Sequence, residues 1–83
     1  MASPKRTLES VKRGGGSIAF RDLQRLLEKL GFQFARVSGS HHIYIHPNMP
    51  RPMNVQSAGK DATPYEVRQL RDITEAFRLK LEE

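Results

Sequence analysis

The sequence predicts an α+β two-layer sandwich in which a helix, a three-stranded antiparallel sheet and a second helix follow one another. Three observations predict it: an apolar stripe at helical spacing over residues 20–30, three short β-prone segments between residues 32 and 56, and a second helical stripe over residues 63–79. The connections between the strands are short, which favours an antiparallel meander. Because each helix and the sheet have an apolar side to bury, we expect both helices to cover one face of the sheet.

The length of 83 residues allows one domain with a modest core. We assign this domain to residues 17–83 and treat residues 1–16 as an N-terminal extension that is partly helical or flexible. Within the extension we expect a flexible start over residues 1–4 and a short helix over residues 7–13. The glycine run at 14–16 is expected to end that helix as a hinge or linker, because glycine loses the most backbone entropy when ordered.

The two helices of the domain carry recognisable ends. Leu30 is the last apolar residue of the first stripe, and Gly31 follows it where a left-handed residue commonly ends a helix. Thr63 and Pro64 predict the start of the second helix, because threonine caps a helix and proline suits its first position.

The strands of the sheet are predicted at residues 32–37, 41–46 and 52–56, followed by a polar loop over residues 57–62. In the first strand the apolar alternation slips between Phe34 and Ala35. Such a slip indicates a bulge or an ambiguous register, so the sequence does not fix which face each side chain of this strand occupies.

Three histidines, His41, His42 and His46, concentrate proton-transfer chemistry in the second strand. Cleavage of RNA without a metal needs a base for the 2′-hydroxyl and an acid for the departing 5′-oxygen. Strand alternation places His41 on one face with two isoleucines, and His42 and His46 on the other face with Tyr44. If the isoleucines are core, the Tyr44 face is exposed; if Tyr44 is core, His41 stands on the open face.

Positive charge without compensating acids marks the middle of the chain. The formal net charge is +5, and no acidic residue occurs between Glu28 and Asp61. Such a segment attracts polyanions, and a cation near the histidines would stabilise the charge that develops on phosphorus. We therefore expect RNA contacts from the cations of this stretch, Lys29, Arg36, Arg51 and Lys60.

Composition disfavours several other classes of site. The chain has no cysteine, which excludes disulfides and thiolate metal sites and fits the reducing cytoplasm of a bacterium or archaeon. The histidine-rich stretch lacks carboxylates, so we expect no metal and no other cofactor there. No apolar run approaches the roughly 20 residues that span a bilayer, so no membrane association is expected.

In order and spacing, several segments resemble the signatures of the HicA toxin family: Phe20 to Phe32, Gly39-Ser40-His41-His42-Ile43-Tyr44, His46-Pro47, Asn54-Val55-Gln56, and Pro64-Tyr65-Glu66-Val67-Arg68-Gln69-Leu70. The resemblance covers about residues 17–75. It implies a fold like that of a double-stranded RNA-binding domain and the activity of a translation-independent mRNA interferase.

The resemblance also implies roles and partners. It places catalysis on His41, the histidine of the Gly-Ser-His motif. We take three neighbours of His41 in the same segment, Ser40, His42 and Tyr44, as supporting candidates. The implied substrate is mRNA, and the implied protein partner is a HicB antitoxin that shields the active residue. Two alternatives stay open: an RNA-binding module without catalysis, and a protein-interaction domain that uses the open sheet. An exposed edge strand could also pair between copies of the chain.

Overall fold

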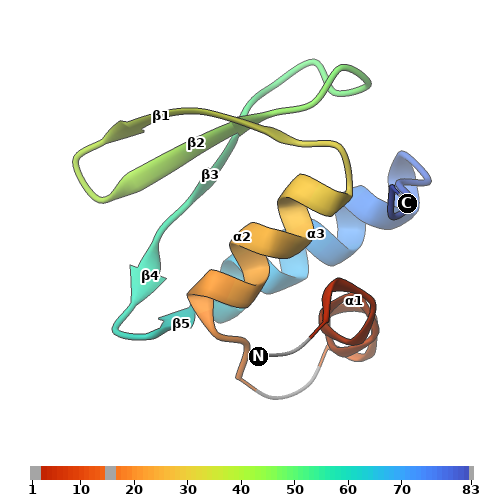
Figure 1. Cartoon of the computed structure of the whole chain (residues 1–83), viewed down its shortest axis with the longest axis horizontal. Helices are drawn as coiled ribbons and strands as arrows, with labels where there is room; N and C mark the ends of the chain where they lie inside the picture. The colour runs from red at the N-terminus through yellow and green to blue at the C-terminus, as the bar shows by residue number, and fades with distance from the viewer. Residues whose placement is uncertain (1–2, 15–16, 83) are drawn as a thin grey trace.

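The structure has a three-stranded antiparallel sheet on one side and helices on the other, which confirms the α+β class (Figure 1). It is a computed structural model that describes residues 3–14 and 17–82. Its elements are α1 (Pro4–Arg13), α2 (Phe20–Lys29), β1 (Gln33–Ser38), β2 (His41–Ile45), β3 (Met53–Val55), β4 (Ser57–Ala58), β5 (Asp61–Ala62) and α3 (Pro64–Ala76). The sheet order is β1-β2-β3, so β1 and β3 form its edges. Within the described residues, no helix is long and apolar enough to cross a membrane.

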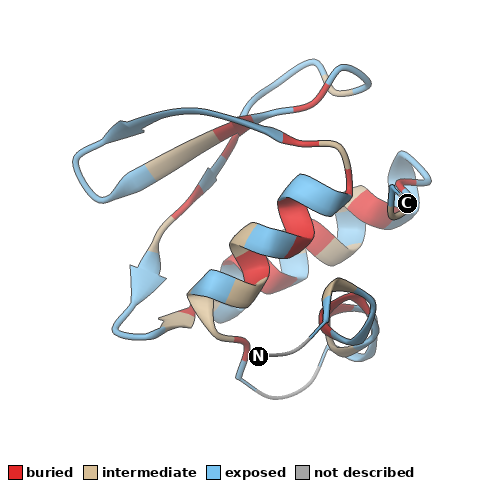
Figure 2. Ribbon diagram, viewed as in Figure 1, coloured by how far each residue is buried: buried red, intermediate tan, exposed pale blue. Residues whose placement is uncertain are grey.

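The core lies between the sheet and the helices (Figure 2). Tyr44 of β2 is only 2% exposed, and it packs in one cluster with Val55 of β3, Leu23 of α2 and Leu70 of α3. Burying each of these side chains contributes about 1.5–3 kcal/mol relative to exposure. The Tyr44 face of β2 therefore meets the helices, which decides the alternative that the sequence left open: His41 stands on the open face.

The end of α2 confirms the role predicted for Gly31. Its φ is +98°, and its N–H donates to the carbonyl of Glu28 at 3.1 Å. The N–H of Phe32 donates to the carbonyl of Leu27 at 3.0 Å. These two bonds form the Schellman pattern, in which a left-handed residue satisfies the last carbonyls of a helix.

Helix α3 begins as predicted but ends earlier than residue 79. At its start, the side-chain oxygen of Thr63 accepts the N–H of Glu66 at 3.3 Å. At its end, Arg78 takes a φ of +53°, and the N–H of Leu79 donates to the carbonyl of Thr74 at 3.0 Å. This turn returns Leu79 to the core, where it is 8% exposed. Burial of one leucine thus ends the helix without a glycine or proline.

Helix α1 begins earlier than the sequence predicted, so the expected flexible start is wrong for the described part of it. The hydroxyl of Ser3 accepts the N–H of Arg6 at 3.3 Å, and Pro4 occupies the first turn. The helix packs against α2 and α3 on the side away from the sheet, where Leu8 and Val11 join the core (Figure 1). Gly14 ends it with a φ of +69°; the other two glycines of the predicted linker lie outside the described residues.

The polar loop predicted over residues 57–62 is instead a small hairpin of β4 and β5. Gly59 occupies its turn with a φ of +70°. The hairpin holds the chain that enters α2, because the N–H of Phe20 donates to the carbonyl of Lys60 at 2.9 Å and the N–H of Ala62 donates to the carbonyl of Ile18 at 2.8 Å. The three strands of the main sheet lie within one or two residues of their predicted bounds.

Candidate active site

A tight turn positions His41 at the first residue of β2. Ser38 pairs with His41 across the hairpin, so only Gly39 and Ser40 connect the strands. Gly39 has a φ of +62°, as the first central residue of a two-residue hairpin turn requires. His41 is exposed, whereas His42 is partly buried and His46 is buried.

A bulge in β1 brings Arg36 to the same face as His41. Phe34 pairs with Tyr44, but the next pair joins Arg36 to Ile43, so Ala35 is the extra residue. Directly paired residues share a face of the sheet. Arg36 therefore lies on the open face, whereas simple alternation after Phe34 would have turned it toward the helices. Of the two alternatives that the slip in alternation left open, a bulge or an ambiguous register, the structure shows the bulge.

Two hollows meet at His41. The first, of about 360 Å³, lies on the open face of the sheet and is lined by Arg36, Ser38, His41, Ile43, Pro52 and Asn54. The second, of about 460 Å³, extends over the edge of β3 to the start of α3 and is lined by His41, Pro52, Asn54, Gln56, Thr63, Tyr65, Glu66 and Gln69. His41 lines both hollows, so a ligand that occupied the two together would contact it.

His42 and Tyr44 lie on the opposite face from His41. The His42 ring packs against Phe20 and Phe34, at centroid distances of 5.2 and 6.3 Å, and its buried Nδ1 has no hydrogen-bond partner. The hydroxyl of Tyr44 accepts a hydrogen bond from the Gln24 amide at 3.3 Å. Burial raises the pKa of Tyr44 above its ordinary value of 10.0, although this hydrogen bond opposes the shift. The sheet therefore separates His42 and Tyr44, two of the three supporting candidates, from His41.

His46 links the end of α2 to the turn after β2. Its Nδ1 accepts the N–H of Asn48 at 3.0 Å, so Nε2 carries the proton and donates it to the carbonyl of Leu30 at 2.9 Å. The ring also packs edge-on against Phe32, with centroids 4.9 Å apart. Both nitrogens are therefore engaged within the fold.

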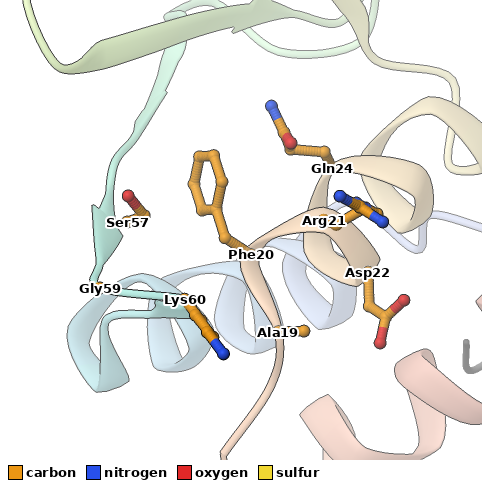
Figure 3. Close-up of a pocket in the computed structure, with 8 residues that line it drawn as sticks. All are labelled: Ala19, Phe20, Arg21, Asp22, Gln24, Ser57, Gly59 and Lys60. Carbon is orange, nitrogen blue, oxygen red and sulfur yellow. The ribbon is translucent and has the colours of Figure 1, made fainter.

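The other predicted contact residues are dispersed. Ser40 lies beside His41 in the turn, and its hydroxyl donates to the Gln56 side-chain oxygen at 3.4 Å. Lys29 lines a hollow on the helical side with Pro4 and Glu82, and Arg51 is exposed between β2 and β3. Lys60 lines a hollow of about 630 Å³ between α2 and the β4–β5 hairpin, where it extends away from the sheet (Figure 3). Arg36 is the predicted cation that lines a hollow with His41.

Four amide or aromatic side chains line the second hollow with His41 although none of them was predicted as a site residue, namely Asn54, Gln56, Tyr65 and Gln69. A signal for two of them was present, because Tyr65 and Gln69 lie four residues apart and so share one face of α3. The buried side chain of Glu66 holds this region together, since its Oε2 accepts the backbone N–H of Gln56 at 2.8 Å.

The arrangement can bind a phosphodiester between a proton acceptor and a cation. His41 offers an exposed imidazole, and Arg36 offers a guanidinium suited to phosphate oxygens. Among residues 3–14 and 17–82, no three side chains of the histidine, cysteine, aspartate and glutamate types are grouped to hold a metal ion.

A family model described as "HicA toxin of bacterial toxin-antitoxin" matches residues 20–76, more than half of the chain. The match begins at the first residue of α2 and ends at the last residue of α3, so it includes the sheet and both hollows at His41. No curated protein and no solved structure matches the chain.

Proposed function

The chain belongs to the HicA toxin family of bacterial toxin–antitoxin systems, and we propose that it is a toxin that cleaves mRNA without a metal, with His41 as its catalytic residue. One observation carries the catalytic proposal: of the three histidines, His41 alone has an exposed side chain. It stands on the open face of a sheet whose residues, 33–55, include no acid. A phosphodiester can therefore approach it from solvent without repulsion from a carboxylate of the sheet.

In the proposed reaction, His41 removes the proton from a 2′-hydroxyl, and the 2′-oxygen attacks the adjacent phosphorus. The bond from phosphorus to the 5′-oxygen breaks, and that oxygen takes up a proton from solvent, while His41 later returns to solvent the proton that it removed. The products are a 2′,3′-cyclic phosphate and a 5′-hydroxyl. Arg36 binds the phosphate oxygens and stabilises the negative charge that they gain in the transition state.

The remaining proposals concern partners. A HicB-type antitoxin would inhibit the toxin by covering the open face around His41. The three other predicted cations, Lys29, Arg51 and Lys60, stay candidates for contacts with more distant parts of the RNA backbone, because Coulomb attraction acts beyond the site.

Incubation of the purified protein with mRNA in EDTA tests the activity. We expect cleavage by the wild-type protein and a loss on the order of 100-fold in the Arg36→Ala variant. The Arg13→Ala variant is the matched control, because Arg13 is an exposed arginine on α1, on the far side of the helices from the sheet. Binding of mRNA with no cleavage by the wild type would contradict the enzyme and favour an RNA-binding module.

Expression in bacterial cells tests the toxin role separately. We expect growth arrest on induction and relief when a HicB-type antitoxin from the neighbouring gene is co-expressed. Normal growth at a confirmed level of folded protein would contradict the toxin role and favour a protein-interaction domain.

A further inference from the structure

Tyr65 is an aromatic side chain that the fold leaves uncovered. It is 67% exposed, the highest value among the exposed large hydrophobic side chains of the described residues. Its place in the first turn of α3 is fixed by the Thr63 cap and by Pro64. A ring this exposed adds little to the core, but its face is available for stacking with a flat ligand.

Amide side chains surround the same hollow. Gln69 follows Tyr65 by four residues on α3, Asn54 lies in β3, and Gln56 directly follows β3. Amides offer both donors and acceptors, as the edge of a nucleobase does. The backbone N–H of Gln56 is bound to the buried carboxylate of Glu66, which ties β3 to α3 and keeps the two walls of the hollow in place.

The two hollows at His41 differ in charge. Arg36 lines the first, whereas no lysine or arginine is among the described residues that line the second. The carboxylate of Glu66 in the second hollow is buried, and one of its oxygens already accepts a backbone N–H. A phosphate therefore fits the side of Arg36, and an uncharged aromatic group fits the side of Tyr65.

We propose that the second hollow is a nucleobase subsite, in which the base of one nucleotide stacks on Tyr65 and forms edge hydrogen bonds with Gln69. The phosphodiester attached to that nucleotide then reaches His41 and Arg36. This inference rests on the proposed function and specifies whether its RNA substrate is paired or unpaired at the site.

A subsite of this kind accepts an unpaired nucleotide. In a duplex each base is stacked between its neighbours and paired at its edge, so Tyr65 and Gln69 could not reach it without opening the helix. An unpaired nucleotide also has the freedom to align its 2′-oxygen, phosphorus and 5′-oxygen for displacement. The toxin therefore acts on single-stranded or looped segments of its RNA.

Binding to an uncleavable RNA tests the subsite. The probe is a short, fluorescently labelled single strand of mixed sequence in which every 2′-hydroxyl is methylated, and the reference is the same strand without its bases. We expect Tyr65→Ala to weaken binding of the probe by about 5- to 150-fold, which is the roughly 1–3 kcal/mol of one base–aromatic stack at about 1.4 kcal/mol per tenfold. Tyr65→Phe keeps the stacking face and should bind within about twofold of wild type.

The reference strand supplies the decisive comparison. Wild type and Tyr65→Ala should bind the strand without bases equally, because the stack is absent from both. Equal losses on both strands, or no loss on either, would overturn the subsite. Tighter binding of the methylated duplex than of the single strand would overturn the unpaired substrate. Thermal unfolding should be unchanged in Tyr65→Ala, because the ring is exposed.

Cleavage of unmodified mRNA by the same proteins separates this inference from the proposed function. If the wild type does not cleave but Tyr65→Ala shows the expected binding loss, the proposed enzyme is wrong and the subsite stands as an RNA-binding site. If cleavage depends on His41 and proceeds equally in Tyr65→Ala, the subsite is wrong and the enzyme stands.

Discussion

Replacement of His41 by alanine should slow RNA cleavage by about 100- to 10 000-fold, the range that general acid–base catalysis by one side chain supplies. The fold should be unaffected, because His41 is exposed and follows a turn whose geometry depends on Gly39. The measurement is the single-turnover rate on a labelled RNA in EDTA, with thermal unfolding of the same sample followed by circular dichroism.

Ile45→Thr is the matched control for that variant. Ile45 lies on the same face of β2 as His41, is 44% exposed and lines neither hollow at His41. Threonine keeps the β-branched shape that strands favour, so the control should cleave at the wild-type rate. A wild-type rate in His41→Ala would place the catalytic group elsewhere or reveal a contaminating nuclease.

Replacement of His46 by alanine should lower the free energy of unfolding by about 2–4 kcal/mol, the largest effect on stability that we expect among the histidines. The variant loses a ring that is 9% exposed and leaves the carbonyl of Leu30 without its partner. Domains of this kind are stable by only about 5–15 kcal/mol, so the loss is a large share of the total. Urea unfolding measures it as a shift in the midpoint.

The two histidine variants should therefore differ in the property that they lose, cleavage rate in one and stability in the other. His46→Ala should retain most of its cleavage rate per folded molecule at a temperature where it stays folded, and His41→Ala should retain its stability. If His46→Ala were as stable as wild type and inactive, the buried histidine would be part of the catalytic machinery and the assignment to His41 alone would be wrong.

The features that the sequence predicted correctly are those that depend on near neighbours. Gly31 ends α2 because a left-handed residue is needed there, and Thr63 with Pro64 starts α3 because the cap and the first turn are local. The slip at Phe34 and Ala35 was visible as a break in alternation, and the structure shows the bulge.

The orientation of β2 could not be read from the strand itself, because one face carries two isoleucines and the other carries Tyr44, and either set could be core. Contacts distant in sequence decide it: Phe20 covers His42, and the amide of Gln24 satisfies the buried hydroxyl of Tyr44. The strands of the β4–β5 hairpin are too short to show alternation, and the end of α3 depends on the burial of Leu79.

The candidate site was predicted only in part for a similar reason. His41 was identified by its motif, but its face required the orientation of β2, and Arg36 reached that face through the bulge. Tyr65 joins the site from α3, and the two segments meet only after the sheet has packed on the helices.

Identification of the end groups on the cleaved RNA tests most directly whether His41 cleaves RNA by activating a 2′-hydroxyl without a metal. In EDTA, the wild-type products should carry 2′,3′-cyclic phosphates and 5′-hydroxyls, and a 2′-deoxy substitution at the cleaved position should block the reaction. The His41→Ala protein should form these products at least about 100-fold more slowly than the wild type. Products with 3′-hydroxyl ends, or cleavage of the 2′-deoxy substrate, would contradict the mechanism.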